Sequence, residues 1–245
     1  MASLCVLFER PVASREIAGA LGELAPEPPE VGAPGVATGE ARVFALAGLR
    51  LEVAPLDERA AEVPLDEAVT YSNWPGAAEA ARRHRALVRV RAIDAGATSA
   101  VEVLRAISRA AGALLTLPGA LALLDEEGRA LSEPVAAARR LAGRLDVPPL
   151  DLWIAVRAFQ LEDADGWFLD TIGMSQFGLP DLEAYSGAGT EVADWLRNIG
   201  LHLVEQVLPL GAGDTLDGPD EEPWITIEDT ATVEPARPVL RFAPM

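Results

Sequence analysis

Hydrophobic positions in the first hundred residues follow two spacings, one typical of strands and one typical of helices. Side chains of a strand alternate between two faces, and residues 86–93 do so: Val88 and Val90 fall on one side, and Arg89 and Arg91 on the other. Side chains on one face of a helix recur every three or four residues, which is the spacing that follows Ser14. The pattern predicts the order strand, helix, strand, strand, helix, strand, over residues 4–9, 14–24, 42–46, 49–54, 75–85 and 86–93.

The remaining sequence continues with helices and strands in alternation. Ser99 and Glu102 form a capping-box pattern, which predicts the start of a helix that reaches about Leu117. A second helix is expected from Pro134, and a third from Thr190, where apolar residues recur on one helical face. Strands are predicted at 120–124, 152–160, 167–174, 182–185, 224–228 and 239–242.

These elements predict an α+β protein with a mainly antiparallel sheet. Residues 1–95 have the element order of a ferredoxin-like βαββαβ unit, residues 96–150 are expected to form a helical connection, and residues 151–245 a second, acidic α+β unit. We expect the two units to share one continuous sheet and to pack together as one globular body.

Composition limits the setting and the chemistry of the protein. Half of its 245 residues are hydrophobic, and no stretch approaches the roughly 18 apolar residues of a membrane span. A single cysteine, Cys5, and a start without the pattern of a signal peptide predict a cytoplasmic protein. All twenty basic residues are arginine, so chemistry that needs a lysine nucleophile or a phosphate-binding lysine is excluded.

Charge is unevenly distributed along the chain, whose net charge is −18. Residues 1–159 contain 21 acidic side chains and 17 arginines, whereas residues 160–236 contain 17 acidic side chains and Arg197 alone. Such a field repels nucleic acid and anionic membranes and attracts basic proteins or cations. Solubility is the alternative explanation. The one basic cluster, residues 82–91, is expected to pair with the acidic C-terminal third or to lie on a solvated face.

The most distinctive stretch, residues 171–183, reads TIGMSQFGLPDLE. Glycine and proline favour tight turns, and Gly178 is expected to take a positive φ. The segment is either a shaped turn that presents carboxylates to a ligand or a structural corner between two strands, with Glu183 facing solvent. Its candidate site residues are Thr171, Gly173, Gly178, Leu179, Pro180, Asp181 and Glu183.

A second candidate region is an oxygen-rich loop near residue 217. Hard cations such as Ca²⁺ require six or more oxygen ligands at set spacing, and this loop does not follow the spacing of a helix-loop-helix calcium site. A solvated acidic loop is therefore favoured over a metal site. Trp224, which follows a proline, is expected to make surface contacts. The candidate partner-binding residues are Asp214, Asp217, Asp220, Glu221, Glu222 and Trp224.

Five stretches carry a resemblance to a known family. They are NWPGAAEAARRHRALVRV at 73–90, PLDLWIAV at 149–156, residues 171–183, DWLRNI at 194–199 and GDTLDG at 213–218. In this order they resemble the bacterial family catalogued as domain of unknown function 4261, over nearly the whole chain, and residues 171–183 are the strongest match. The resemblance implies a shared α+β fold and a bacterial, cytoplasmic setting, and it implies no reaction.

Three hypotheses about function follow. The first is a non-enzymatic protein-binding module whose acidic face engages a basic protein, for instance a toxin or effector that it neutralises or escorts. The second is a metal-assisted hydrolase that uses Asp181, Glu183 and the carboxylates of 214–220 as oxygen ligands. The third is an accessory subunit without a small-molecule site. We expect no cofactor, no nucleic acid and no membrane as partner, and the sequence leaves the oligomeric state open.

Overall fold

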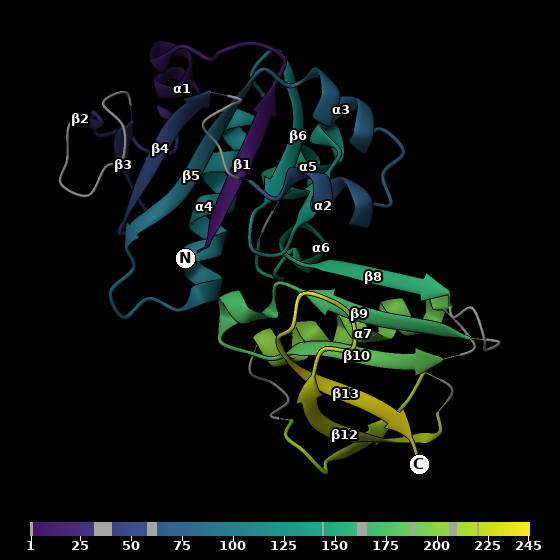
Figure 1. The fold of residues 1–245 in the computed structure, drawn as a ribbon. Coiled ribbons are helices and arrows are strands. Elements are labelled where there is room, and N and C mark those ends of the chain that lie inside the picture. The colour runs from purple at the N-terminus through teal and green to yellow at the C-terminus, as the bar shows by residue number, and fades with distance from the viewer. Residues whose placement is uncertain are drawn as a thin grey trace. The chain divides into compact units, whose positions relative to one another are not determined.

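The computed structural model describes residues 2–31, 41–57, 63–143, 145–160, 166–186, 189–205, 210–219 and 221–245. The chain divides into two compact units, Met1–Trp153 and Ile154–Met245 (Figure 1). Each unit has its own sheet, so the prediction of one continuous sheet is wrong. Pro148 and Pro149 lie between the last strand of one sheet and the first strand of the next, and proline lacks the amide hydrogen that a sheet ladder requires.

The first unit contains a seven-stranded sheet in the order β2-β3-β4-β5-β1-β6-β7. All of its neighbouring strands are antiparallel. Every residue of the central strand β1 is buried, which is typical of a strand covered on both faces. The strands are β1 (Ser3–Phe8), β2 (Glu30–Val31), β3 (Arg42–Leu46), β4 (Leu49–Asp57), β5 (Ala86–Asp94), β6 (Ala120–Asp125) and β7 (Ala130–Ser132).

The predicted ferredoxin-like arrangement differs from these pairings, although the predicted elements are present. A split βαβ unit has two parallel strands joined by a helix, with a third strand between them. Here β5 lies between β1 and β4 and is antiparallel to both, and β3 is antiparallel to β4. As a result β1 and β3 run in opposite directions. The α+β class is confirmed. The strand order differs from the ferredoxin-like order because β5 pairs with β4 as well as with β1.

Helices cover both faces of the first sheet. The helix α4 begins after Ser99, whose side chain accepts a hydrogen bond from the Glu102 amide, as the capping-box pattern predicted. Residues 96–150, predicted as a helical connection, also contribute β6, which pairs with β1 at the centre of the sheet. The helices are α1 (Ser14–Leu21), α2 (Leu65–Tyr71), α3 (Ala77–Arg83), α4 (Ala100–Leu114), α5 (Pro134–Ala142) and α6 (Leu150–Trp153).

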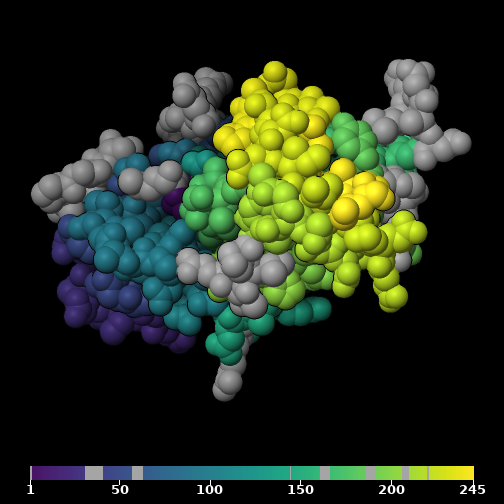
Figure 2. Space-filling model, turned by 90° about the horizontal axis from the view of Figure 1, so that it is seen from below, coloured from purple at the N-terminus to yellow at the C-terminus, as the bar shows by residue number. Residues whose placement is uncertain are grey.

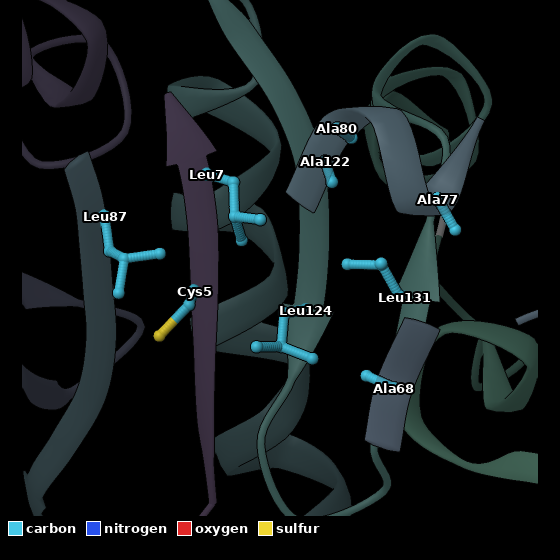
Figure 3. Packing of buried hydrophobic residues seen from close by; sticks show 9 residues of the cluster. All are labelled: Cys5, Leu7, Ala68, Ala77, Ala80, Leu87, Ala122, Leu124 and Leu131. Atoms are coloured by element: carbon cyan, nitrogen blue, oxygen red, sulfur yellow. The ribbon is translucent and has the colours of Figure 1, made fainter. Parts of the chain in front are cut away.

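One hydrophobic cluster joins α2 and α3 to the first sheet (Figure 3). Small alanines on the helices allow close approach to larger side chains from the sheet. Burial raises the pKa of the Cys5 thiol in this cluster, so its thiolate, the reactive form, is disfavoured. The buried members are Cys5, Leu7, Ala68, Ala77, Ala80, Leu87, Ala122, Leu124 and Leu131.

The second unit contains a six-stranded sheet in the order β11-β12-β13-β10-β9-β8. β10 and β13 are parallel, and the other neighbours are antiparallel. Helix α7 (Gly189–Val204) packs on one face, where Trp195 contacts the rings of Trp224 and Phe242. The strands are β8 (Ala155–Gln160), β9 (Trp167–Ile172), β10 (Asp181–Ser186), β11 (Thr215–Asp217), β12 (Pro223–Thr230) and β13 (Pro238–Pro244).

None of the helices in the described part of the chain combines the length and the apolar character that crossing a lipid bilayer requires.

Candidate functional site

The distinctive segment forms a corner between β9 and β10. A short 3-10 helix, Met174–Phe177, fills the corner, and a glycine lies at each of its ends. Gly173 has a φ of 117° and Gly178 a φ of 73°, values that residues other than glycine rarely adopt. The positive φ expected at Gly178 is therefore confirmed. Leu179 and Pro180 connect this corner to β10. Both glycines therefore serve the geometry of the turn, because each takes a φ that the turn requires.

Asp181, at the start of β10, is buried and does not present its carboxylate to solvent. Its Oδ1 accepts hydrogen bonds from the Thr171 hydroxyl at 3.1 Å and from the Met174 amide at 3.0 Å. Its Oδ2 accepts from Arg237 Nε at 2.8 Å. Thr171 in turn accepts from the Leu182 amide at 2.8 Å. Burial raises the pKa of Asp181, against the opposing effects of the Met174 amide and the Arg237 charge.

Asp170, in β9, is fully buried and binds two arginines. Arg157 donates from Nε to Asp170 Oδ1 at 2.7 Å and from Nη2 to Oδ2. Arg237 donates from Nη2 to the same Oδ2 at 2.7 Å and to the Thr171 carbonyl at 2.9 Å. Arg157 also donates to the carbonyl of Glu234 at 2.9 Å. Burying a carboxylate is costly unless it is paired and hydrogen-bonded, and here two guanidinium groups donate to Asp170.

Glu183, two residues after Asp181, is fully buried as well, so the expectation that it faces solvent is wrong. Its Oε1 accepts from the Thr232 amide at 2.8 Å, and its Oε2 accepts from Arg241 Nη2 at 2.9 Å and Nε at 3.1 Å. Arg241 also donates to Asp229 at 2.6 Å. Strand alternation places Glu183 and Asp181 on the same face of β10, where arginines from other segments meet them.

The register of the strands explains why these charges meet. Arg157 lies opposite Asp170, Asp170 opposite Glu183, and Glu183 opposite Arg241. The four side chains form a row across β8, β9, β10 and β13 on the face of the sheet opposite α7, because Ala184 and Phe242, their neighbours in sequence, face the helix side with Trp195. Arg237 and Asp181 extend this row to three carboxylates and three guanidinium groups.

The loop between β12 and β13, residues 231–237, crosses the charged row, and we call it the strap (Figure 1). Its ends are closed by a bond from the Ala231 amide to the Arg237 carbonyl at 2.8 Å. Hydrogen bonds attach it to the rest of the unit: Thr232 donates to Glu183, Arg157 donates to the Glu234 carbonyl, and Arg237 donates to Asp170 and Asp181. The strap is therefore held by the buried charges.

The variant Glu183→Gln tests this attachment. A hydrogen bond to a charged group contributes about 1.5–3 kcal/mol, so weakening the Thr232 contact is expected to speed amide exchange in the strap about tenfold or more. Hydrogen exchange of the full chain, read by mass spectrometry on peptides covering 231–237, measures this. Glu228→Gln, which changes an exposed carboxylate of the neighbouring β12, should leave the strap unchanged. Equal exchange in both variants contradicts the attachment.

The oxygen-rich loop near residue 217 is exposed, as expected for a solvated acidic loop. The carboxylate of Asp214 accepts from the Gly211 amide at 2.8 Å, and Asp217 ends β11. Glu221 and Glu222 are exposed as well, and Asp220 lies outside the described residues. Trp224 is only 2% exposed, so the prediction of a surface contact is wrong.

Trp224 is buried because of strand alternation. Pro223 begins β12, and the next residue points to the face that α7 covers. There its ring lies 5.3 Å from that of Trp195. A proline beside a tryptophan therefore marks the start of a strand here, not an exposed turn.

Among the described residues, the carboxylates proposed as ligands of a hydrolytic metal are not brought together. Asp181 and Glu183 lie on β10, whereas Asp214 and Asp217 lie at β11, and β12 and β13 separate the two strands. With neighbouring strands about 4.8 Å apart, β10 and β11 are about 14 Å apart. Across the residues that the structure describes, no group of three or more His, Cys, Asp or Glu side chains is placed to hold a metal ion.

The arginine cluster at 82–91 pairs within its own unit, so the expectation that it pairs with the C-terminal third is wrong for these contacts. Arg83 pairs with Glu9 at 2.7 Å, and Arg82 pairs with Glu79. On β5, Arg89 pairs with Glu126 at 2.7 Å and Arg91 with Glu52 at 2.9 Å. These carboxylates all lie in the first unit, where acidic residues and arginines are nearly balanced.

Sequence reasoning missed the arginines and one carboxylate of the buried row. Arg157 and Asp170 each stand alone among apolar residues of a strand, in AVRAFQ and WFLDTI. Charged residues are almost never fully buried unless they are paired, so a single charge within an apolar strand is a signal for such pairing. Arg241 gives the same signal in PVLRFAP, whereas Arg237 lies outside the strands, and both arginines meet carboxylates more than 50 residues earlier in sequence.

Residues 170–243 match the model of the family described as Domain of unknown function (DUF4261). The match covers Asp170, Asp181, Glu183, Arg237 and Arg241, whereas the stretches 73–90 and 149–156 lie outside it. No curated protein and no solved structure matches the chain.

Proposed function

We propose that this chain, whose residues 170–243 form a DUF4261 domain, is a non-enzymatic protein-binding module that engages a basic partner. The observation that carries the proposal is the charge left on the surface of the second unit after its internal pairs are made. Residues 154–245 contain 17 acidic side chains and four arginines, a net charge of −13. The buried row engages three of those arginines, and the fourth, Arg197, pairs with Asp194 at 2.6 Å.

The exposed carboxylates of this unit therefore outnumber its arginines. Among the exposed carboxylates of the described residues, Asp194 pairs with Arg197 and Asp229 pairs with Arg241. The C-terminal strands, lime to yellow in Figure 2, form a continuous part of the surface seen there. The exposed carboxylates of the described residues are Glu191, Asp194, Glu205, Asp214, Asp217, Glu221, Glu222, Glu228, Asp229 and Glu234.

A surface of this charge selects its partners by electrostatics. It repels polyanions such as nucleic acid, and it speeds encounter with cationic proteins. Complementary charges act mainly on association rate and specificity, which suits a module that finds one basic protein among many. A basic toxin or effector that must be neutralised or escorted has this chemistry.

Affinity purification from the native host tests the proposal, with the full chain as bait. A fourfold variant, Asp214→Asn, Asp217→Asn, Glu221→Gln and Glu222→Gln, keeps side-chain size and the acceptor oxygen on Asp214. We expect this variant to lose a basic partner that the natural chain retains. Salt at about 1 M, where the Debye length is about 3 Å, should elute the partner from the natural chain.

The matched control removes four exposed carboxylates from the first unit: Glu23→Gln, Glu27→Gln, Glu133→Gln and Asp146→Asn. It makes the net charge less negative by the same amount but leaves the acidic surface of the second unit intact. Retention by this control and loss by the first variant supports the proposal. Equal loss in both, or a partner that stays bound at about 1 M salt, contradicts it.

A further inference from the structure

The face of the second sheet opposite α7 is only partly covered by the strap. The strap lies over Asp170, Asp181 and Glu183. Further along the same face the strands carry apolar side chains. Alternation places Tyr185 two residues beyond Glu183, and Ala243 two residues beyond Arg241, on the same side of the sheet.

Neighbouring strands bring these side chains together as one patch. Ile225 lies directly opposite Ala243, and Ile227 lies opposite Arg241. Ala184 pairs with Phe242, so Tyr185 lies beside Ala243. We call Tyr185, Pro223, Ile225, Ile227 and Ala243 the apolar patch.

The patch is accessible to a partner. Tyr185 is 38% exposed and Ile227 is 42% exposed, which is unusual for large hydrophobic side chains in this chain. Pro223 is exposed, and Ile225 and Ala243 are half-buried. Contiguous apolar surface surrounded by polar residues is typical of interaction sites.

Carboxylates border the patch. Asp217 lies directly opposite Pro223 on β11, and Asp229 follows Ile227 by two residues, on the same face of β12. Glu221 and Glu222 precede Pro223, and all four are exposed. Arg241, which lies within this surface, is engaged by Glu183 and Asp229. The border is therefore negative.

We infer that the apolar patch and its acidic border form the docking surface for a basic amphipathic polypeptide segment, with apolar residues on one side and Lys or Arg at its margins. The inference rests on the proposed function and adds the place and the chemistry of contact. Charge decides against a second copy of this chain as occupant, because two units of net charge −13 repel each other. A segment with flanking cations pairs with the border while its apolar side covers Tyr185 and Ile227.

Two synthetic peptides of leucine and lysine, about 18 residues long, serve as probes. They share one composition: one places all leucines on a single helical face, and the other is scrambled. Fluorescence anisotropy with the full chain measures their affinities. We expect the amphipathic peptide to bind at least about tenfold more tightly than the scrambled one, since only its leucines can cover the patch together.

Substitutions locate the contact. Ile227→Asn and Tyr185→Ser should each weaken the amphipathic peptide about tenfold and leave the scrambled peptide unchanged. Val135→Asn is the matched control, because Val135 is a 60% exposed hydrophobic residue on α5 of the first unit; it should change nothing. Tyr185 also contacts the ring of Phe168 at 5.0 Å, so circular dichroism checks its fold, and Ile227→Asn carries the test if Tyr185→Ser unfolds.

The outcomes separate this inference from the proposed function. Equal binding of the two peptides, abolished by the fourfold acidic variant, overturns the apolar patch and leaves the acidic module standing. Failure of both peptides to bind contradicts the proposed function and the patch together. A dimer in sedimentation that Ile227→Asn dissociates shows that the patch binds a second copy, which overturns the basic segment as its occupant.

Discussion

Replacing Asp170 with asparagine is expected to destabilise the second unit by about 3–5 kcal/mol, the cost of removing one partner from a buried ion pair. Arg157 and Arg237 both donate to this carboxylate, and both are largely buried. An asparagine has the same shape but leaves the two guanidinium groups with one negative charge fewer. The loss of stability is expected in β8, β9 and the strap, which these hydrogen bonds connect.

Hydrogen exchange of the full chain measures this effect where it occurs, because it reports the free energy of opening element by element. The control is Asp194→Asn, which removes an exposed pair with Arg197 one helical turn away and should change stability by less than about 0.5 kcal/mol. An Asp170→Asn variant that loses less than about 1 kcal/mol in β8 and β9 contradicts the view that this carboxylate organises the buried row.

The charged row also fixes the register of the sheet. A slip of one residue turns every side chain of a strand to the opposite face. For β9, such a slip turns Asp170 away from Arg157 and toward α7, whose apolar residues Val192 and Leu196 are buried. An unpaired charge in an apolar site is far more costly than a lost hydrophobic contact. The row therefore disfavours wrong pairings more strongly than it stabilises the correct one.

Much of the fold was predictable from local pattern, and its long-range pairing was not. The capping box at Ser99 and the alternation at 86–93 each predicted an element that the structure contains. The short strands β2, β7 and β11 were missed, since two or three residues cannot show alternation. The position of β5 between β1 and β4 depends on packing between distant segments, which spacing along the chain does not record.

For the candidate site, backbone geometry was predictable and charge pairing was not. Glycine takes a positive φ more readily than other residues do, so the positive φ of Gly178 could be expected from its place in the turn. A count of charges assigns Asp181 and Glu183 to an acidic surface, although each is neutralised by an arginine 56 or 58 residues later. Composition adds up charges without showing which of them meet. The carboxylates that remain exposed support the proposed function more selectively than the net charge of the whole chain did.

Replacing Trp224 with alanine is expected to destabilise the second unit by about 3–5 kcal/mol, the usual cost of removing a buried large aromatic side chain. Its ring contacts Trp195 and, with Phe242, fills the space between α7 and the sheet. Trp224→Phe keeps most of this packing and should cost clearly less. Hydrogen exchange in β12, β13 and α7 of the full chain measures both effects.

The same two variants decide between a buried role and a surface role for Trp224. If Trp224→Ala leaves exchange unchanged but abolishes binding of the amphipathic peptide, the side chain is a partner contact, as its proline neighbour first indicated. If exchange accelerates across the three elements, any loss of binding follows from unfolding. The packing against α7 requires the second result, and it is the reason that the docking experiments use Ile227, which projects from the same strand toward the opposite face.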